Sequence, residues 1–147
     1  MESKSILVVE DNADDEQLTL RALRHSKNPA SAVAVPNVIH IARDGAEALD
    51  MLVGPSALSP LPDLVLLDLK LPKLNGLEVL ARLSDTSRSK RPAVVVLTSS
   101  DEERDISRCY ELGANSYIRK PVDFDEFLDA VRQIMSYWLL VNQAPQK

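Results

Sequence analysis

Residues 64–72 read LVLLDLKLP, and they are the strongest indication of the fold in this sequence. Its first four residues are aliphatic, and such a run predicts a strand that is buried on both faces, as strands of a parallel sheet are. A buried strand does not tolerate a carboxylate in its interior, so Asp68 marks its carboxyl end. Pro72 cannot continue a central strand, and the turn signal Asn75-Gly76 follows, so the chain leaves the sheet just after Asp68. Ligands bind at this edge of open α/β sheets, although an aspartate that merely caps the next turn explains Asp68 equally well when it is taken alone.

Four more segments are predicted to form strands, and segments with apolar residues at helical spacing alternate with them. A β-α unit repeated five times predicts an α/β domain with a parallel sheet, right-handed crossovers and helices on both faces. The last helix carries an apolar stripe from Phe124 to Trp138 that is expected to face the sheet. The expected strands cover residues 5–9, 38–42, 64–67, 93–97 and 116–119, and the expected helices cover residues 12–25, 46–53, 76–83, 101–112 and a segment that begins near residue 123.

Polar side chains follow four of these strands, and the carboxyl ends of parallel strands meet at one edge of a sheet. Glu10 and Asp11 follow the first strand, Asp68 the third, Thr98 the fourth and Lys120 the fifth. Three crowded carboxylates repel one another unless a cation neutralises them, and oxygen ligands favour Mg²⁺ or a similar hard ion. Such an ion leaves positions open for phosphate oxygens, and Lys120 and Thr98 would hold further ones. The set predicts a phosphoryl-transfer site in which Asp68 is the candidate nucleophile that forms an acyl phosphate.

The composition is that of a soluble globular protein of one domain. The 147 residues are 45% hydrophobic and 27% charged, and the formal net charge is −5. A negative net charge argues against nucleic acid as a partner. No apolar run approaches the roughly 20 residues that a membrane helix needs, and the first residues lack a signal-peptide pattern, so we expect a cytoplasmic protein with no membrane partner. Cys109 is the single cysteine, which excludes an internal disulfide and a zinc site.

The residues at this edge resemble the receiver domain of two-component response regulators. The likeness spans about Ile6 to Ile134, nearly the whole chain, and it implies a flavodoxin-like doubly wound fold with strand order 2-1-3-4-5. It rests on Glu10-Asp11, on Asp68 with Pro72 and Asn75-Gly76 behind it, on Leu97-Thr98-Ser99 and on the segment from Tyr117 to Pro121, all in the family's order and spacing.

The resemblance implies a role for each carboxylate. Asp68 would be phosphorylated by a sensor histidine kinase, and no enzymatic activity beyond self-phosphorylation and self-dephosphorylation is expected. Mg²⁺ would be bound by Asp11, Asp68 and the backbone carbonyl of Lys70, with help from Glu10. Glu10 departs from the family's pattern, in which an aspartate is more usual, but its longer side chain should still bind a metal through water.

The resemblance also implies how phosphorylation is read. Thr98 and Lys120 would hold the phosphoryl oxygens, and the Lys120-Pro121 peptide bond would be cis. A phosphoryl group adds nearly two negative charges and would draw both side chains inward. The movement of Thr98 would make room for Tyr117 to rotate, which would change the surface of the fourth helix, fifth strand and fifth helix. A half-buried strand tyrosine with no such role is the alternative explanation for Tyr117.

The end of the chain predicts output through protein contacts. Only a helix and a tail fit after Lys120, so we expect a single receiver domain over residues 1–147, with a core of about 5–135, a hydrophobic extension at 136–147 and no output domain. Residues 138–141 add apolar surface, which favours a homodimer through the fourth helix, fifth strand and C-terminal helix; a simply packed terminus is the alternative. The proline-rich loop at residues 54–62 and this ending are similar to those of stand-alone receivers that partner bacterial phytochrome-type histidine kinases, which implies light signalling.

Functions of other classes explain less of the sequence. A phosphatase of the haloacid-dehalogenase type also uses an aspartate nucleophile, but the position of its second acid is Lys70 here. A flavodoxin-like cofactor binder needs a phosphate-binding loop after the first strand. Phosphate would be repelled there by the acids Glu10, Asp11, Asp14 and Asp15. A protein-binding module that works without phosphorylation stays open as the other alternative.

Overall fold

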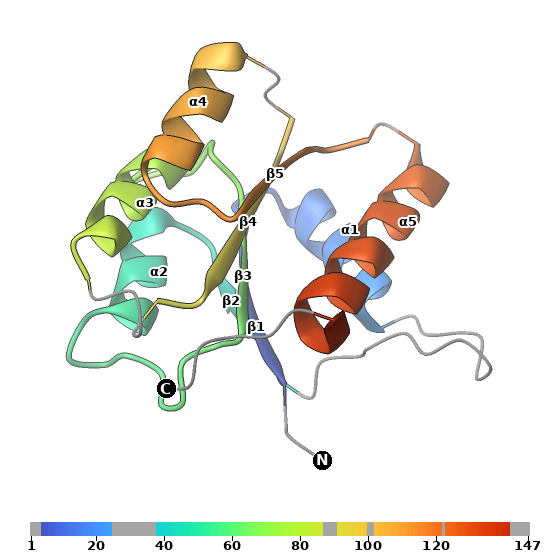
Figure 1. The fold of residues 1–147 in the computed structure, drawn as a ribbon. Helices are drawn as coiled ribbons and strands as arrows, with labels where there is room; N and C mark the ends of the chain where they lie inside the picture. Colours follow the sequence, from blue (N-terminus) through green and yellow to red (C-terminus); the bar gives the residue numbers. More distant parts are fainter. Residues whose placement is uncertain (1–3, 25–37, 87–90, 100–101, 122, 142–147) are drawn as a thin grey trace.

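The fold is described by a computed structural model that covers residues 4–24, 38–86, 91–99, 102–121 and 123–141 (Figure 1). Within these ranges, strands and α-helices alternate along the chain, and a π-helix follows the last α-helix. The strands are β1 (Ser5–Val9), β2 (Val38–Ala42), β3 (Leu64–Leu67), β4 (Ala93–Thr98) and β5 (Ser116–Arg119). The helices are α1 (Ala13–Arg24), α2 (Gly45–Leu52), α3 (Gly76–Ser84), α4 (Glu103–Glu111), α5 (Phe124–Met135) and the π-helix η2 (Ser136–Val141).

The strands form one parallel sheet in the order β2-β1-β3-β4-β5, so the expected α/β class and strand order are confirmed. All four residues of β3 are buried, as the aliphatic run predicts. Val9 of β1 is paired with Leu67 of β3, and Leu67 is paired with Val96 of β4. The three central strands therefore reach their carboxyl ends at nearly the same level.

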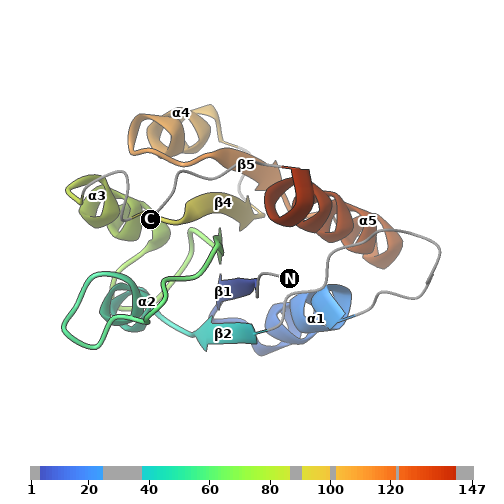
Figure 2. The same cartoon turned by 60° about the horizontal axis from the view of Figure 1, so that its bottom comes forward.

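Helices cover both faces of the sheet, with α2, α3 and α4 on one side and α1 and α5 on the other (Figures 1 and 2). Leu7 and Val9 belong to the core on the first side, whereas Ile6 and Val8 belong to the core on the second. This division follows from β geometry, because successive side chains of a strand point to opposite faces. The sheet is thus a rigid middle layer whose edge positions the polar residues beyond each strand.

The start of α5 differs from its expected packing. Although the helical spacing places Phe124 on the inner face, its side chain is exposed, and the guanidinium of Arg21 lies 5.6 Å from the ring centre. Phe124 is the first residue of the helix, directly after the N-cap Asp123, and the first buried residue of α5 is Phe127. Its ring contacts α1 instead of the core.

The apolar segment after α5 packs in part against its own domain. Leu139 is buried, and Trp138 is half-buried against the same core cluster as Val131 of α5. Tyr137 remains 49% exposed and makes an edge-to-face contact with Trp138. Residues 142–147 of the expected extension lie outside the described residues, as does the end of the first predicted helix at His25. Among the described helices, none has the length and apolar character to span a membrane.

Candidate functional site

The site lies at the edge where the central strands end. The backbone N–H of Glu10 donates to the last carbonyl of β2 at 3.0 Å, and the N–H of Asp68 donates to the last carbonyl of β1 at 3.1 Å. The N–H of Lys120 donates to the carbonyl of Thr98 at 2.7 Å. The sheet's hydrogen bonding therefore continues one residue past the strands, and it holds the backbone of these residues in register.

Three carboxylates gather at this edge. Single oxygens of Glu10, Asp11 and Asp68 lie within 4.8 Å of one another, with Glu10 and Asp68 buried and Asp11 exposed. Their oxygen-only donor set fits a hard divalent cation, and the exposed Asp11 leaves one side of the cluster open to solvent. The three predicted side-chain ligands are thus brought together.

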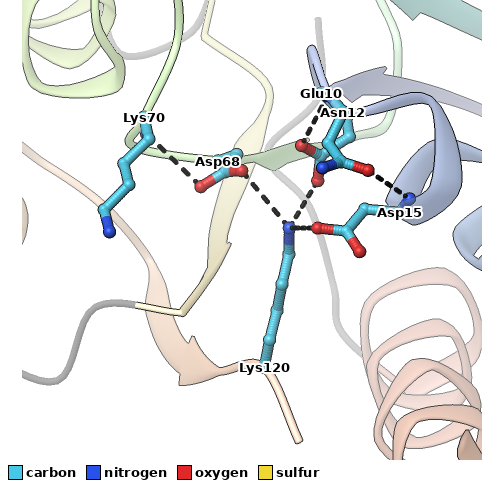
Figure 3. A network of polar contacts seen from close by, with 6 residues as sticks. All are labelled: Glu10, Asn12, Asp15, Asp68, Lys70 and Lys120. Atoms are coloured by element: carbon cyan, nitrogen blue, oxygen red, sulfur yellow. Dashed lines mark hydrogen bonds and ion pairs between the residues drawn. The ribbon is translucent and has the colours of Figure 1, made fainter. Parts of the chain in front are cut away.

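Lys120 is the cation of the cluster (Figure 3). Its Nζ contacts Asp15 at 2.9 Å and Asp68 at 3.2 Å, and it makes a shorter contact with Glu10. The side chain of Lys120 is only 10% exposed, and those of Glu10 and Asp68 are exposed to a similarly small extent. The lysine therefore offsets part of the repulsion between the carboxylates.

The pKa values of the cluster follow from this arrangement. Burial raises the pKa of Glu10 to about 7, although the hydrogen bond from Lys120 opposes the shift. Burial alone would also raise the pKa of Asp68, but a hydrogen bond with Glu10 and the charge of Lys120 outweigh it and lower that pKa. Glu10 is therefore protonated in part near neutral pH, while the lowered pKa keeps Asp68 ionised, as a nucleophile requires. Burial would lower the pKa of Lys120, but the contacts with Glu10 and Asp68 raise it, so the ammonium stays charged.

Asp15 is a site residue that sequence reasoning missed. In the sequence it is one of several acids in the first turn of a helix, where acids are common because they suit the helix dipole. The N-cap Asn12 accepts a hydrogen bond from the N–H of Asp15 at 3.0 Å, and the N–H of Asn12 donates to Glu10 at 3.3 Å. No local pattern could have placed Asp15 on the face of α1 that looks toward the site, because Asp11 lies before the first residue of the helix.

A second unpredicted contact fixes the start of α1. Glu16 is buried, and the guanidinium of Arg43 donates to its two carboxylate oxygens at 3.0 and 3.2 Å. Arg43 directly follows β2, so this bidentate pair attaches the first turn of α1 to the edge of the sheet.

The remaining predicted residues lie around Asp68. Thr98 is fully buried at the end of β4, and a hydrogen bond with it helps to lower the pKa of Asp68. The backbone N–H of Lys70 donates to Asp68 at 3.3 Å, while its side chain is exposed and extends away from Lys120 (Figure 3). The carbonyl of Lys70 as a metal ligand stays a prediction. The expected cis bond at Lys120-Pro121 is wrong, because the cis peptide bond found in the described residues joins Ser59 to Pro60.

Tyr117 lies on β5, half-buried against the core on the α2, α3 and α4 side. Its backbone N–H donates to the hydroxyl of Tyr110 at 3.1 Å, which links α4 to β5. The role of Tyr117 as a switch stays a prediction.

The loop after Asp68 is held by close backbone packing. Gly76 begins α3, and its N–H donates to the carbonyl of Leu69 at 2.9 Å. A Cβ atom at Gly76 would lie 2.4 Å from the carbonyl oxygen of Asp68, so only glycine fits there. Asn75 and Glu78 form a reciprocal capping box at the start of the helix. The turn signal at residues 75–76 thus fixes how close α3 approaches Asp68.

Known proteins are similar to this chain in fold and in sequence. A family model for the response regulator receiver domain matches residues 6–132. Response regulator Rcp1 of Synechocystis sp. is 39% identical over 138 residues, which cover 92% of this chain and 89% of Rcp1. The crystal structure of the Mn²⁺-bound form of Rcp1 aligns with a TM-score of 0.79 at 36% identity, over 97% of this chain and 99% of the other.

Two further solved structures are similar over nearly the full chain. The phosphorylated cyanobacterial phytochrome response regulator RcpA aligns with a TM-score of 0.86 at 39% identity, over 99% of this chain and 100% of the other. The bacteriophytochrome response regulator AtBRR aligns with a TM-score of 0.68 at 44% identity, over 97% of this chain and 100% of the other. Fold, acidic cluster and sequence agree: the chain belongs to the response regulator receiver domain family, whose members are signalling proteins phosphorylated on an aspartate.

Proposed function

We propose that Asp68 is the phosphoacceptor of this receiver and that a sensor histidine kinase is the donor. The observation that carries the proposal is the placement of Asp68, which is buried and ionised at the end of β3, 3.2 Å from Nζ of Lys120 and beside Glu10 and Asp11. In the transfer, a carboxylate oxygen of Asp68 attacks the phosphorus of a phosphohistidine. The bond between phosphorus and the ring nitrogen breaks, and the imidazole leaves with the electron pair.

Mg²⁺ is the proposed metal, held by Glu10, Asp11, Asp68 and the backbone carbonyl of Lys70. It would neutralise oxygens of the phosphoryl group during transfer. Lys120 would donate to one phosphoryl oxygen and Thr98 to another, since both already contact Asp68. Donation by Thr98 would shift the end of β4, which pairs with β5, and Tyr117 would respond to that shift.

The proposed kinase partner is of the phytochrome type. The names of RcpA and AtBRR support this choice, because both are phytochrome response regulators similar to this chain over nearly its whole length. Phosphotransfer from such a kinase implies a cytoplasmic location and a role in light signalling. Transfer at least tenfold faster from a phytochrome-type kinase than from an unrelated histidine kinase is the expected result, and equal rates would contradict the choice of partner.

The proposed output is a protein contact made by one receiver domain with a core of about residues 5–135 and the extension that begins at residue 136. Exposed aromatic side chains at Tyr110 and Tyr137 support a homodimer through α4, β5 and the C-terminal helix. Light scattering after size-exclusion chromatography should give twice the chain mass for the native protein. A Tyr110→Glu and Tyr137→Glu double variant should give the mass of one chain, and an unchanged mass would exclude this surface.

The phosphoacceptor is tested by intact mass after incubation with acetyl phosphate. The native protein should gain one phosphoryl group when Mg²⁺ is present and none when EDTA replaces it. Asp68→Asn should gain none, whereas Asp50→Asn, at an exposed position of α2, should react as the native protein does. A native protein that gains no mass would favour a phosphorylation-independent binding module, and a gain that persists in Asp68→Asn would place the phosphoryl group elsewhere.

The raised pKa of Glu10 predicts that Mg²⁺ binding depends on pH. Glu10 titrates near pH 7 in the metal-free protein, above its ordinary value of 4.5, so below pH 7 the metal must displace a proton. We expect the apparent affinity for Mg²⁺ to fall by about fivefold between pH 7 and pH 6, measured by isothermal titration calorimetry. Glu10→Gln should remove most of this dependence, and a native affinity that is constant from pH 6 to pH 8 would contradict the prediction.

A further inference from the structure

We propose that Asp15 is a positioning residue that holds Lys120 in the unphosphorylated protein and competes with the phosphoryl group for it. The inference rests on the proposed function, because it assigns Lys120 to the phosphoryl oxygens. Asp15 thereby sets how readily the phosphorylated state forms.

Lys120 uses all of its donors before phosphorylation. An ammonium group has three N–H donors, and the Nζ of Lys120 contacts three carboxylates. A phosphoryl oxygen on Asp68 can receive a hydrogen bond from Lys120 only if one of these contacts is released. Glu10 and Asp68 are buried, so the release of either one would separate a buried carboxyl group from its cation.

Asp15 is the partner that can be released at the least cost. Its side chain is 38% exposed, against 4% for Glu10 and 9% for Asp68, so water can replace the lysine as its partner. Its backbone is fixed by the N-cap Asn12 and by the neighbouring ion pair of Glu16 with Arg43. The side chain can therefore turn to solvent without movement of α1.

The negative charge of Asp15 should weaken the binding of a phosphoryl group at the site and strengthen the binding of a divalent cation. Asp15 and Asp68 contact the same Nζ atom, so the negative charge of Asp15 lies close to the phosphoryl group and repels it. The same charge attracts a divalent cation bound by Glu10, Asp11 and Asp68. If Asp15 had a purely structural role, its replacement would weaken the binding of both ligands, because it would disturb their common site.

The test uses beryllofluoride with saturating Mg²⁺ as a stable substitute for the phosphoryl group. Asp15→Asn keeps the shape and removes the charge, and it should tighten beryllofluoride binding by about two- to fivefold, as expected for a half-exposed charge. The same variant should weaken Mg²⁺ binding in the absence of beryllofluoride. Asp15→Glu should bind both ligands as the native protein does. Asp14→Asn, the matched control at an exposed position of the same turn, should also leave both affinities unchanged.

The outcomes separate the inference from the function on which it rests. A native protein that does not bind beryllofluoride would overturn the proposed function and the role of Asp15 with it. Native binding with an equal or weaker affinity in Asp15→Asn would overturn the role of Asp15 alone. An equal gain in Asp14→Asn would also overturn it, because the effect would then come from net charge and not from the contact with Lys120.

Discussion

Replacement of Lys120 by methionine is expected to lower the free energy of unfolding by about 3–5 kcal/mol at pH 8 in the absence of divalent metal. The loss is large because the side chains of Lys120, Glu10 and Asp68 are exposed by 10%, 4% and 9%. Without the lysine, two buried carboxylates would face each other with no cation between them. Breaking such an arrangement leaves uncompensated buried charge, which is far more costly than the loss of a surface pair.

The pH and metal dependence of Lys120→Met distinguishes this cause from a simple packing defect. Removal of the lysine takes away contacts that lower the pKa values of Glu10 and Asp68 in the folded state, so both values should rise, and the pKa of Glu10 is already above its ordinary value. A folded-state pKa above the unfolded value makes stability fall as pH rises, so the deficit should be smaller at pH 5.5 than at pH 8. Mg²⁺ binds only the folded site and should restore part of the loss at pH 8.

Urea unfolding at the two pH values, with and without Mg²⁺, measures these effects. Lys73→Met is the matched control, because the side chain of Lys73 is 70% exposed and contacts Asp44 at 3.4 Å. It should change the stability by less than about 1 kcal/mol under every condition. Similar losses in the two variants, or no recovery of Lys120→Met with Mg²⁺, would show that Lys120 is not the internal cation of the carboxylate cluster.

Gly76→Ala is expected to affect both stability and phosphorylation. The new methyl group would lie 2.4 Å from the carbonyl oxygen of Asp68 and 2.7 Å from Cα of Leu69, and both of these are backbone atoms. Because the backbone must shift, we expect a loss of about 1–3 kcal/mol, even though alanine favours a helix by about 1 kcal/mol over glycine. The shift displaces Asp68 itself, so its phosphorylation by acetyl phosphate should slow by about tenfold or more.

Gly54→Ala provides the control for Gly76→Ala. A Cβ atom at Gly54 would be 3.4 Å from its nearest neighbours, which is ordinary contact. Its stability should stay within about 0.5 kcal/mol of the native value, and its phosphorylation rate should not change. Native-like stability and rate in Gly76→Ala would show that the loop after Asp68 moves away without consequence for the site.

The sequence predicted the centre of the sheet well because the strands β1, β3 and β4 are buried on both faces. Continuous apolar runs leave little doubt about β1, β3 and β4, and the polar residues that follow each run mark where the strands end. Parallel pairing then places Glu10, Asp68 and Lys120 at one edge of the sheet. The strand order, by contrast, came from the family resemblance, because the apolar runs are too much alike to specify which strands are neighbours.

Contacts that depend on how a helix is placed could not be predicted. The contact of Asp15 with Lys120 needs the rotation of α1 against the sheet, which no local pattern states. The ion pair between Arg43 and the buried Glu16 could not be predicted either, because the sequence indicates a surface position for both residues. The expectation that Phe124 faces the sheet was wrong for a related reason. Helical spacing predicts which face of a helix is apolar, but it does not predict where along the helix the buried part begins.

The hydroxyl of Tyr110 has a consequence for solubility. β5 is an edge strand, and exposed N–H groups of edge strands are templates on which another chain can add a strand. The N–H of Tyr117 in this strand donates to the hydroxyl of Tyr110, so α4 covers part of the open edge of the sheet. A displacement of α4 during signalling would uncover that edge, and the partner that receives the signal would then also protect the protein from aggregation.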